Sequence, residues 1–226
     1  MKKNESFKTI SSFLSKIKFF ILLFSLIIII IMKKTKKKIG VVGMFHDDNA
    51  GNNLVKFSIY IKLKEFGFNP TIIAVSSNHN IYFLQKYLKL KLVKTSFLEL
   101  NKKDYDILMV NSDQTWNGNP KHTDIIFNVG YLKFAENWAI PRFVYGASLG
   151  DNYWKFSSKF DIIARRLLKK FSGISVREIG AIEIVKKHLG IHPELVLDPT
   201  LIIDKNYYII QLCHLLFIKK IPTYII

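Results

Sequence analysis

Cysteine is almost absent from this sequence, because Cys213 is the only one among 226 residues. A single cysteine excludes an internal disulfide and any metal site that needs several thiolates from one chain. It also favours a reducing compartment, since secreted domains of this size commonly carry paired cysteines. We therefore expect a cytoplasmic protein.

Acidic residues are scarce as well: 17 Asp and Glu stand against 34 Lys and Arg, which gives a net charge of +17. The excess is uneven, because residues 1–38 hold ten lysines and one glutamate. The rest of the chain has no arginine cluster and no basic motif interleaved with aromatic residues, which are the features that nucleic-acid binding favours. We expect no nucleic-acid partner.

A hydrophobic run long enough to cross a membrane is also missing. The longest uncharged apolar run, residues 19–32, has fourteen residues, whereas a spanning helix needs about twenty. No small-residue cleavage site follows it, so a signal peptide is disfavoured. Three interpretations of residues 1–37 remain: a tilted membrane anchor at the inner face of the membrane, an interfacial helix, or translated upstream sequence before a start at Met32. The last is favoured slightly.

Three catalytic or cofactor motifs are absent. The loop after the first predicted strand lacks the G-x-G-x-x-G spacing of dinucleotide-binding folds. Ser148 is not surrounded by a G-x-S-x-G nucleophile elbow. His122 has no second metal-binding residue three or four positions on. We expect neither a metal ion nor a bound cofactor.

What the sequence does contain is a regular alternation of apolar runs and helical patterns. Such alternation predicts an α/β fold, a Rossmann-like parallel sheet with flanking helices whose loops gather at one edge. This domain is expected over residues 38–192. Strands are predicted at 38–45, 70–75, 92–95, 107–110, 143–145, 174–176 and 195–197, and helices at 54–66, 80–90, 156–171 and 179–189.

The most informative stretch is Asp104–Asn117, where a buried strand ends in a dense group of polar and aromatic residues. Ligands of open α/β sheets bind beyond the carboxyl ends of the strands, so Ser112 and the residues after it are expected to face a crevice. The alternative is a capped turn with one packing tryptophan. Similarly, Asn49, Gly51, Asn52 and Asn53 present amides at a helix start, although a helix cap explains one of them.

Five strings in this sequence, taken in order, resemble the polysaccharide pyruvyl transferase family. The resemblance covers about residues 38–204. Asn111, Thr115 and Gly146 depart mildly from the family pattern, which has Gly, Val and Ala at these positions. The five strings are NAGNN (49–53), NSDQTWN (111–117), YGASLG (145–150), ISVRE (174–178) and VLDPTLII (196–203).

The resemblance implies transfer of a pyruvyl group from phosphoenolpyruvate to a sugar of a surface polysaccharide, which forms a ketal. It also implies a glycosyltransferase-B-like fold in which two Rossmann-like domains face each other across a cleft. Arg177 is expected to bind an anion, or instead to hold Glu178 or the domain hinge. Catalytic residues are left unassigned. The substrate-binding residues that the resemblance implies are Asn49, Gly51, Asn52, Asn53, Ser112, Asp113, Gln114, Trp116, Asn117, Ser148 and Arg177.

The end of the sequence departs most from the family. Only 26 residues follow Thr200, whereas a second Rossmann-like domain needs on the order of 100. Residues 193–226 are therefore expected to be the start of a truncated second domain with an aberrant apolar tail. The chain alone is expected to be inactive as an enzyme, and the alternative functions are a sugar-binding single domain or a non-catalytic fragment.

Overall fold

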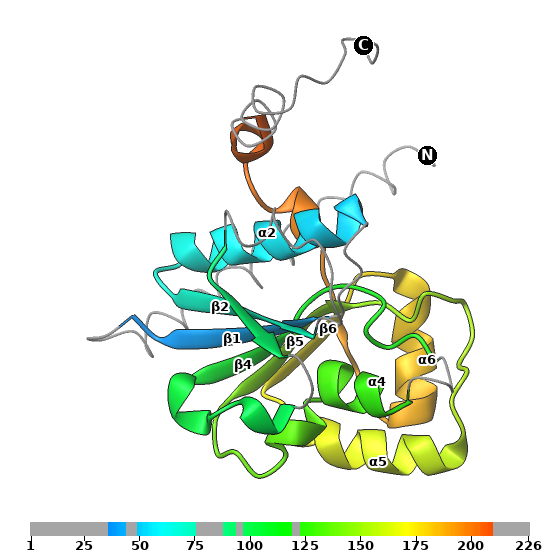
Figure 1. Ribbon diagram of the computed structural model, residues 1–226. Helices are drawn as coiled ribbons and strands as arrows, with labels where there is room; N and C mark the ends of the chain where they lie inside the picture. The colour runs from blue at the N-terminus through cyan, green and yellow to red at the C-terminus, as the bar shows by residue number, and fades with distance from the viewer. Residues whose placement is uncertain (1–35, 44–48, 76–87, 94–96, 119–122, 210–226) are drawn as a thin grey trace, which may run out of the picture.

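A seven-stranded parallel sheet forms the centre of the molecule, in the strand order β3-β2-β1-β4-β5-β6-β7 (Figure 1). The computed structural model describes residues 36–43, 49–75, 88–93, 97–118 and 123–209. Every neighbouring pair of strands is parallel. The predicted Rossmann-like α/β sheet with flanking helices is therefore confirmed.

Most predicted elements are present, with shifted ends. The strands are β1 (Lys38–Gly43), β2 (Asn69–Val75), β3 (Leu90–Val93), β4 (Ile107–Val110), β5 (Arg142–Ala147), β6 (Gly173–Val176) and β7 (Glu194–Leu195). The α-helices are α2 (Ala50–Glu65), α4 (Thr123–Gly130), α5 (Ser158–Leu168) and α6 (Ile179–Leu189). Short 3₁₀ helices are η1 (Phe97–Glu99), η2 (Lys102–Asp104), η4 (Lys133–Ala135) and η5 (Pro199–Leu201).

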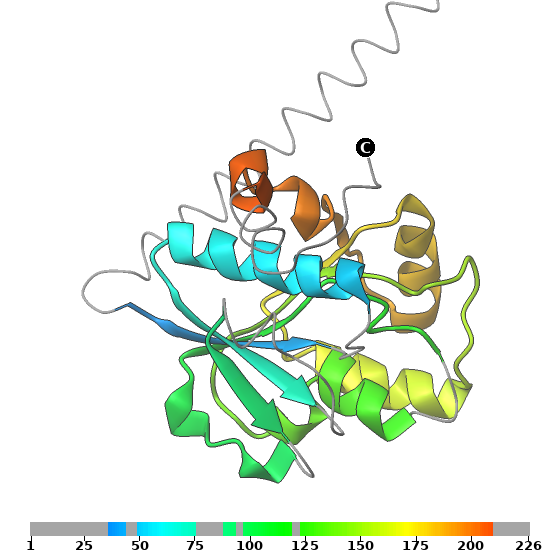
Figure 2. The same cartoon turned by 45° about the horizontal axis from the view of Figure 1, so that its top comes forward.

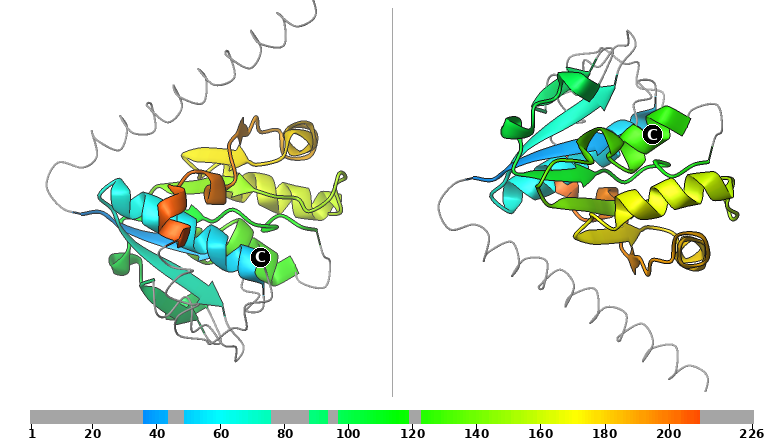
Figure 3. Two further views of the ribbon diagram at one scale, coloured as in Figure 1. Left: turned by 90° about the horizontal axis from the view of Figure 1, so that it is seen from above. Right: turned by 90° about the horizontal axis from the view of Figure 1, so that it is seen from below.

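The helices divide between the two faces of the sheet. Helix α2 crosses one face with η5 beside it, and α4 and α5 lie against the other face (Figures 2 and 3). Helix α6 packs on α5 and on the edge formed by β6 and β7. Right-handed crossovers explain this division, because the chain leaves β1 in one direction and β4 in the opposite one. Two apolar cores result, one on each face.

Local signals explain where the helices begin and end. The side chains of Asn49 and Ser157 accept backbone N–H groups at the starts of α2 and α5, as N-cap residues do. Gly67 and Gly190 follow α2 and α6 with φ values of 83° and 67°, a left-handed conformation that glycine adopts without steric cost. The predicted stop at Gly67 is thus confirmed.

Several predictions fall on other parts of the chain. The run 19–32 and the greater part of the expected helix 80–90 lie outside the described residues, as does His122. Among the described residues, no helix is both long and apolar enough to cross a membrane. Residues 194–201 add β7 and η5 to the sheet and to α2, and the domain boundary at 192 stays a prediction.

Arg142 is an unusual core residue, because its side chain is only 2% exposed at the start of β5. Its guanidinium donates hydrogen bonds to the backbone carbonyls of Trp138 at 2.6 Å and Glu136 at 3.2 Å, and also to that of Ala135. Burial lowers its pKa, and the carboxylate of Glu136 opposes that effect. The arginine thus ties the segment after η4 to the sheet.

We predict that Arg142→Met lowers the free energy of unfolding by about 2–4 kcal/mol, because several buried carbonyls lose a charged donor. The matched control is Arg166→Met, since Arg166 pairs with the carboxylate of the same Glu136 but its side chain is 57% exposed. That surface pair is expected to contribute about 0–1 kcal/mol. Urea denaturation of both variants measures the difference, and equal losses would contradict the structural role of Arg142.

Candidate functional site

The sheet reverses its winding between β1 and β4, and the residues gathered at the carboxyl ends of these two strands are called the crevice below. From β1 the chain passes through α2 to β2, whereas from β4 it passes through α4 to β5 on the opposite side (Figure 1). Loops diverge at such a switch point, which is why ligands of open parallel sheets bind there. Two predicted segments, 49–53 and 111–117, meet at this position.

The start of α2 contributes two asparagines with different roles. Asn49 is the N-cap, and its side-chain oxygen accepts the backbone N–H of Asn52 at 3.0 Å. The side-chain amide of Asn52 instead donates to the carboxylate of Asp113, 61 positions along the chain. Capping therefore explains Asn49 but not Asn52. Gly51 is exposed and Asn53 is half-buried on the same first turn.

Asp113 is the best-anchored polar residue of the crevice. Its backbone extends β4 by a bridge to Ala147, and its carbonyl accepts the N–H of Ser148 at 2.8 Å. One carboxylate oxygen accepts the N–H of Gln114 at 2.7 Å, and the other accepts the amide of Asn52. Backbone and side chain are thus both fixed, while the residue remains partly exposed.

A buried hydroxyl chain lies beneath this loop. Ser112 Oγ donates to the carbonyl of Gly146 at 2.7 Å, and the N–H of Gly146 donates to Ser175 Oγ at 2.9 Å. Gly146 has φ 61°, and the β5–β6 register shifts between Val144 and Ala147. This irregularity turns the end of β5 toward Asp113.

The outer rim of the crevice carries exposed amides. Asn117 Nδ2 donates to Gln114 Oε1 at 3.0 Å, and Gln114 is exposed. Beside them, the N–H of Gly150 donates to Ser148 Oγ at 3.1 Å. Side-chain amides of this kind both donate and accept hydrogen bonds, which suits hydroxyl-rich ligands.

Trp116 lies in the core, apart from the rim amides. The indole is 1% exposed and stacks on Tyr131 with ring centroids 5.4 Å apart. Its N–H donates to the carbonyl of Gly130 at 2.9 Å. This arrangement matches the packing alternative, because a ring so deeply buried has no free face for a sugar.

Arg177 is engaged in ion pairs at the end of β6. Its guanidinium lies 2.7 Å from the carboxylate of Asp198 and 3.1 Å from that of Glu178, and it donates to Ser112 Oγ at 3.4 Å. Asp198 in turn caps η5. The arginine thus joins the β6 loop to the segment that crosses toward α2, which is the holding role considered as an alternative to anion binding.

Two residues of the crevice escaped the sequence analysis, Lys56 and Asn111. Lys56 lies one turn after Asn52 on α2 and is 1% exposed, and Asn111 directly follows β4 and is equally buried. Burial lowers the pKa of Lys56 to about 7, although the carboxylate of Asp113 raises it. The sequence contained one signal for the burial of Lys56. It lies between the apolar residues Val55 and Phe57, four positions after Asn52.

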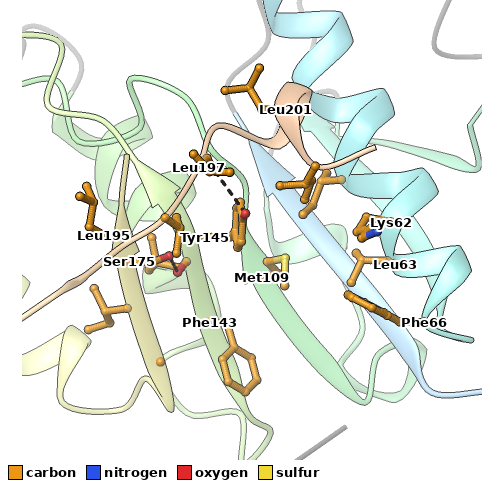
Figure 4. Close-up of a pocket in the computed structure, with 16 residues that line it drawn as sticks. Lys62, Leu63, Phe66, Met109, Phe143, Tyr145, Ser175, Leu195, Leu197 and Leu201 are labelled. Carbon is orange, nitrogen blue, oxygen red and sulfur yellow. Dashed lines mark hydrogen bonds between the residues drawn. The ribbon is translucent and has the colours of Figure 1, made fainter. Parts of the chain in front are cut away.

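Two cavities of the described structure lie elsewhere. One of about 330 Å³ lies between α2, β4–β6 and the segment 195–202, and its labelled lining is mostly apolar (Figure 4). Another of about 630 Å³ opens at the amino-terminal edge of the strands, beside Lys37, Asp106 and Ser172. Because the apolar cavity offers few hydrogen-bonding groups, it does not suit a sugar. The described residues contain no group of three or more His, Cys, Asp or Glu that could hold a metal ion.

Comparison with known protein families matches residues 49–216 to polysaccharide pyruvyl transferase. This match covers more than half of the chain and includes both segments that meet at the switch point. The chain belongs to this family. A search of curated proteins found no significant match.

Within this pyruvyl transferase family member, nine of the eleven predicted binding residues fall into three groups, and the other two, Gly51 and Asn53, lie on the first turn of α2. Asn52, Asp113, Gln114, Asn117 and Ser148 are brought together around the crevice. Asn49, Ser112 and Arg177 support it from below or beside it. Trp116 faces the core.

Gly146 is expected to be essential for the shape of the crevice. A Cβ atom at this position would lie 3.0 Å from Ser112 Oγ, on a backbone with positive φ. We therefore predict that Gly146→Ala lowers the free energy of unfolding by about 1–2 kcal/mol. Urea denaturation with fluorescence detection measures the change.

The control is Gly180→Ala, in the first turn of α6, where a Cβ atom would meet nothing within 4 Å. Alanine is the better helix former, so this variant is expected to be more stable by about 0.5 kcal/mol. A Gly146→Ala protein as stable as the wild type would show that the positive φ is not required.

Proposed function

We propose that this protein transfers a pyruvyl group from phosphoenolpyruvate to a sugar of a cell-surface polysaccharide, and that the crevice between β1 and β4 binds the acceptor sugar. The contact between Asn52 and Asp113 carries the proposal, because it joins two segments of the family match at the switch point of the sheet. The carboxylate and the nearby amides have the hydrogen-bonding chemistry that sugar hydroxyls need.

The sugar and phosphoenolpyruvate together supply all the atoms and electrons of the reaction. Two hydroxyl oxygens of the sugar form bonds to C2 of phosphoenolpyruvate, and the bond from C2 to the phosphate oxygen breaks. One hydroxyl proton ends on C3, which becomes a methyl group, and the other leaves with inorganic phosphate. The product is a pyruvate ketal, and no oxidant or reductant is needed.

Asp113 is the residue we assign to the acceptor hydroxyl. Its carboxylate is partly exposed and is held by Asn52 and by the N–H of Gln114, so it has a fixed direction in which to accept a further hydrogen bond. Gln114 and Asn117 supply amides at the rim. Arg177 is already paired with Asp198 and Glu178.

The donor requires groups beyond those of this crevice. Phosphoenolpyruvate is strongly anionic and is best bound by arginines or helix N-termini. We propose that a second Rossmann-like domain supplies them across a cleft, in a glycosyltransferase-B-like arrangement. Phosphoenolpyruvate is a metabolite of the cytosol, so we place the reaction in the cytoplasm, at the inner face of the membrane if residues 19–32 form an anchor.

The test combines turnover with binding. Purified protein is incubated with phosphoenolpyruvate and a panel of methyl hexosides, and phosphate release and the ketal methyl signal are followed by NMR. Saturation-transfer NMR on the same samples reports sugar binding. Ketal formation supports the full proposal, and binding without turnover supports a sugar-binding domain. The absence of both overturns the assignment of the crevice.

We predict that Asp113→Asn lowers sugar affinity or turnover by about 10- to 100-fold, because a hydrogen bond to a charged acceptor is lost. The control is Asp104→Asn, an exposed aspartate in η2 at the opposite end of β4. Isothermal titration with the best methyl hexoside measures affinity for both variants. If the two variants bind equally well, Asp113 does not contact the acceptor.

A further inference from the structure

A short segment between β5 and α5, residues 151–155, lies against the rim of the crevice and is called the arm below. A Cβ atom placed on Gly150, just before the arm, would lie 2.9 Å from Gln114 Cδ. At the other end of the arm, a Cβ atom placed on Gly118 would lie 2.5 Å from Lys155 Cβ. Both ends of the arm therefore lie beside the same stretch of rim, although they are several positions apart in the sequence.

Trp154 fixes the middle of the arm to the rest of the fold. Its indole N–H donates to the carboxylate of Asp161 at 2.7 Å, and its ring stacks on His188 with centroids 5.2 Å apart. Asp161 is a buried residue of α5, and His188 belongs to the last turn of α6. The backbone of the arm is thus held by two helices, so the residue before Trp154 has a defined place.

That residue is Tyr153, and its side chain is turned outward. It is 63% exposed. The ammonium group of Lys155 lies over its ring, 5.5 Å from the centroid, and the same ammonium pairs with the carboxylate of Asp151. A cation over an aromatic ring is attracted to it. The arm therefore holds its own aromatic ring in place while leaving much of that ring in contact with water.

A single exposed aromatic residue is ordinary on a protein surface, so its place decides what it means. This ring stands on a fixed arm, and both ends of the arm lie beside the rim amides of the crevice. Tyrosine offers a large, rigid contact surface at a low cost in conformational entropy, which is why binding surfaces are rich in it. The position of Tyr153 is thus one where an aromatic ring can serve a ligand.

The polar groups of the crevice leave one part of a sugar without a partner. Asp113, Gln114 and Asn117 offer groups that suit hydroxyls. A sugar ring also presents C–H groups on its faces, and these pack on aromatic rings. Trp116 was expected to bind substrate, but it is 1% exposed. The aromatic surface must come from another residue, and the arm carries one.

We propose that Tyr153 binds the acceptor sugar directly, with its ring packed on the C–H groups of a hexopyranoside whose hydroxyls bind Asp113 and the rim amides. The inference rests on the proposed function of the crevice and deepens it, because it specifies the class of acceptor. A closed sugar ring presents a rigid face of C–H groups. A linear alditol carries similar hydroxyls but has no such face, so it should bind poorly.

The experiment compares Tyr153→Ala with the conservative Tyr153→Phe. The control is Leu98→Ala, which removes a side chain that is 89% exposed in η1, before β4. We expect Tyr153→Ala to bind the best methyl hexoside on the order of 10-fold more weakly. Tyr153→Phe should keep the wild-type affinity, because it retains the ring, and Leu98→Ala should match the wild type. Isothermal titration measures all four proteins.

Two further measurements separate sugar contact from a structural effect. Urea denaturation should give Tyr153→Ala nearly the wild-type stability, because the ring is mostly exposed. Titration with the alditol that corresponds to the best hexose should show that the wild type prefers the closed ring. That preference should shrink in Tyr153→Ala and persist in Tyr153→Phe. A loss of affinity through unfolding would weaken both ligands equally and would overturn the inference.

The outcomes also distinguish this inference from the proposed function. Suppose the wild type binds a hexoside and Asp113→Asn weakens binding, but Tyr153→Ala binds as the wild type does. The crevice then stands as the acceptor site, and the role of Tyr153 is rejected. If Tyr153→Ala weakens binding and Asp113→Asn does not, the sugar lies on the arm alone and both assignments to one sugar fail. A wild type that binds no hexoside overturns both.

Discussion

The parallel pairing of β1 with β4 is the constraint on which the rest of the structure depends. It aligns Val42 with Val110, so the two strands end at the same height and at the same edge of the sheet. Helix α2 follows β1 on one face, and α4 follows β4 on the other. The meeting of segments 49–53 and 111–117 at this edge is therefore a consequence of topology rather than of any particular side chain.

The polar side chains at this position lower the stability of the fold, because burying polar groups costs free energy. A buried lysine, a partly exposed aspartate and a buried asparagine are gathered where an ordinary core would be apolar. The side-chain amide of that asparagine, Asn111, has no hydrogen-bond partner among the described residues. Stability is supplied elsewhere, by two apolar clusters on the faces of the sheet and by Arg142, which binds backbone carbonyls. Such separation is common in enzymes, because polar groups that suit a ligand rarely suit folding.

Sequence patterns predicted the positions of helices and strands well. They predicted the contacts of individual side chains less well. Helix 179–189 and strand 107–110 were predicted with the observed ends, because apolar periodicity and a terminal glycine are local signals. The expected helix 156–171 is shorter, since Ser157 caps its start. The short 3₁₀ helices were missed, because one turn leaves no periodic pattern.

Two residues of the crevice show why local patterns reach only part of a site. Trp116 stood among polar residues and was expected to bind substrate, yet its ring packs on Tyr131, which belongs to a later segment. Lys56 was passed over because a lysine on a helix normally faces water. Its burial depends on β1 and β4, which no window around α2 contains. Contacts between distant segments decided both cases.

Asn52 and Asp113 are 61 positions apart, so the ribosome adds one of them well before the other. Ribosomes add about 5–20 residues per second, so α2 waits on the order of several seconds before β4 exists to receive it. During that interval Lys56 can stay hydrated, and the early segment lacks the central strand that would bury it. The pairing of Asn52 with Asp113 therefore cannot form until β4 and the residues after it have been made.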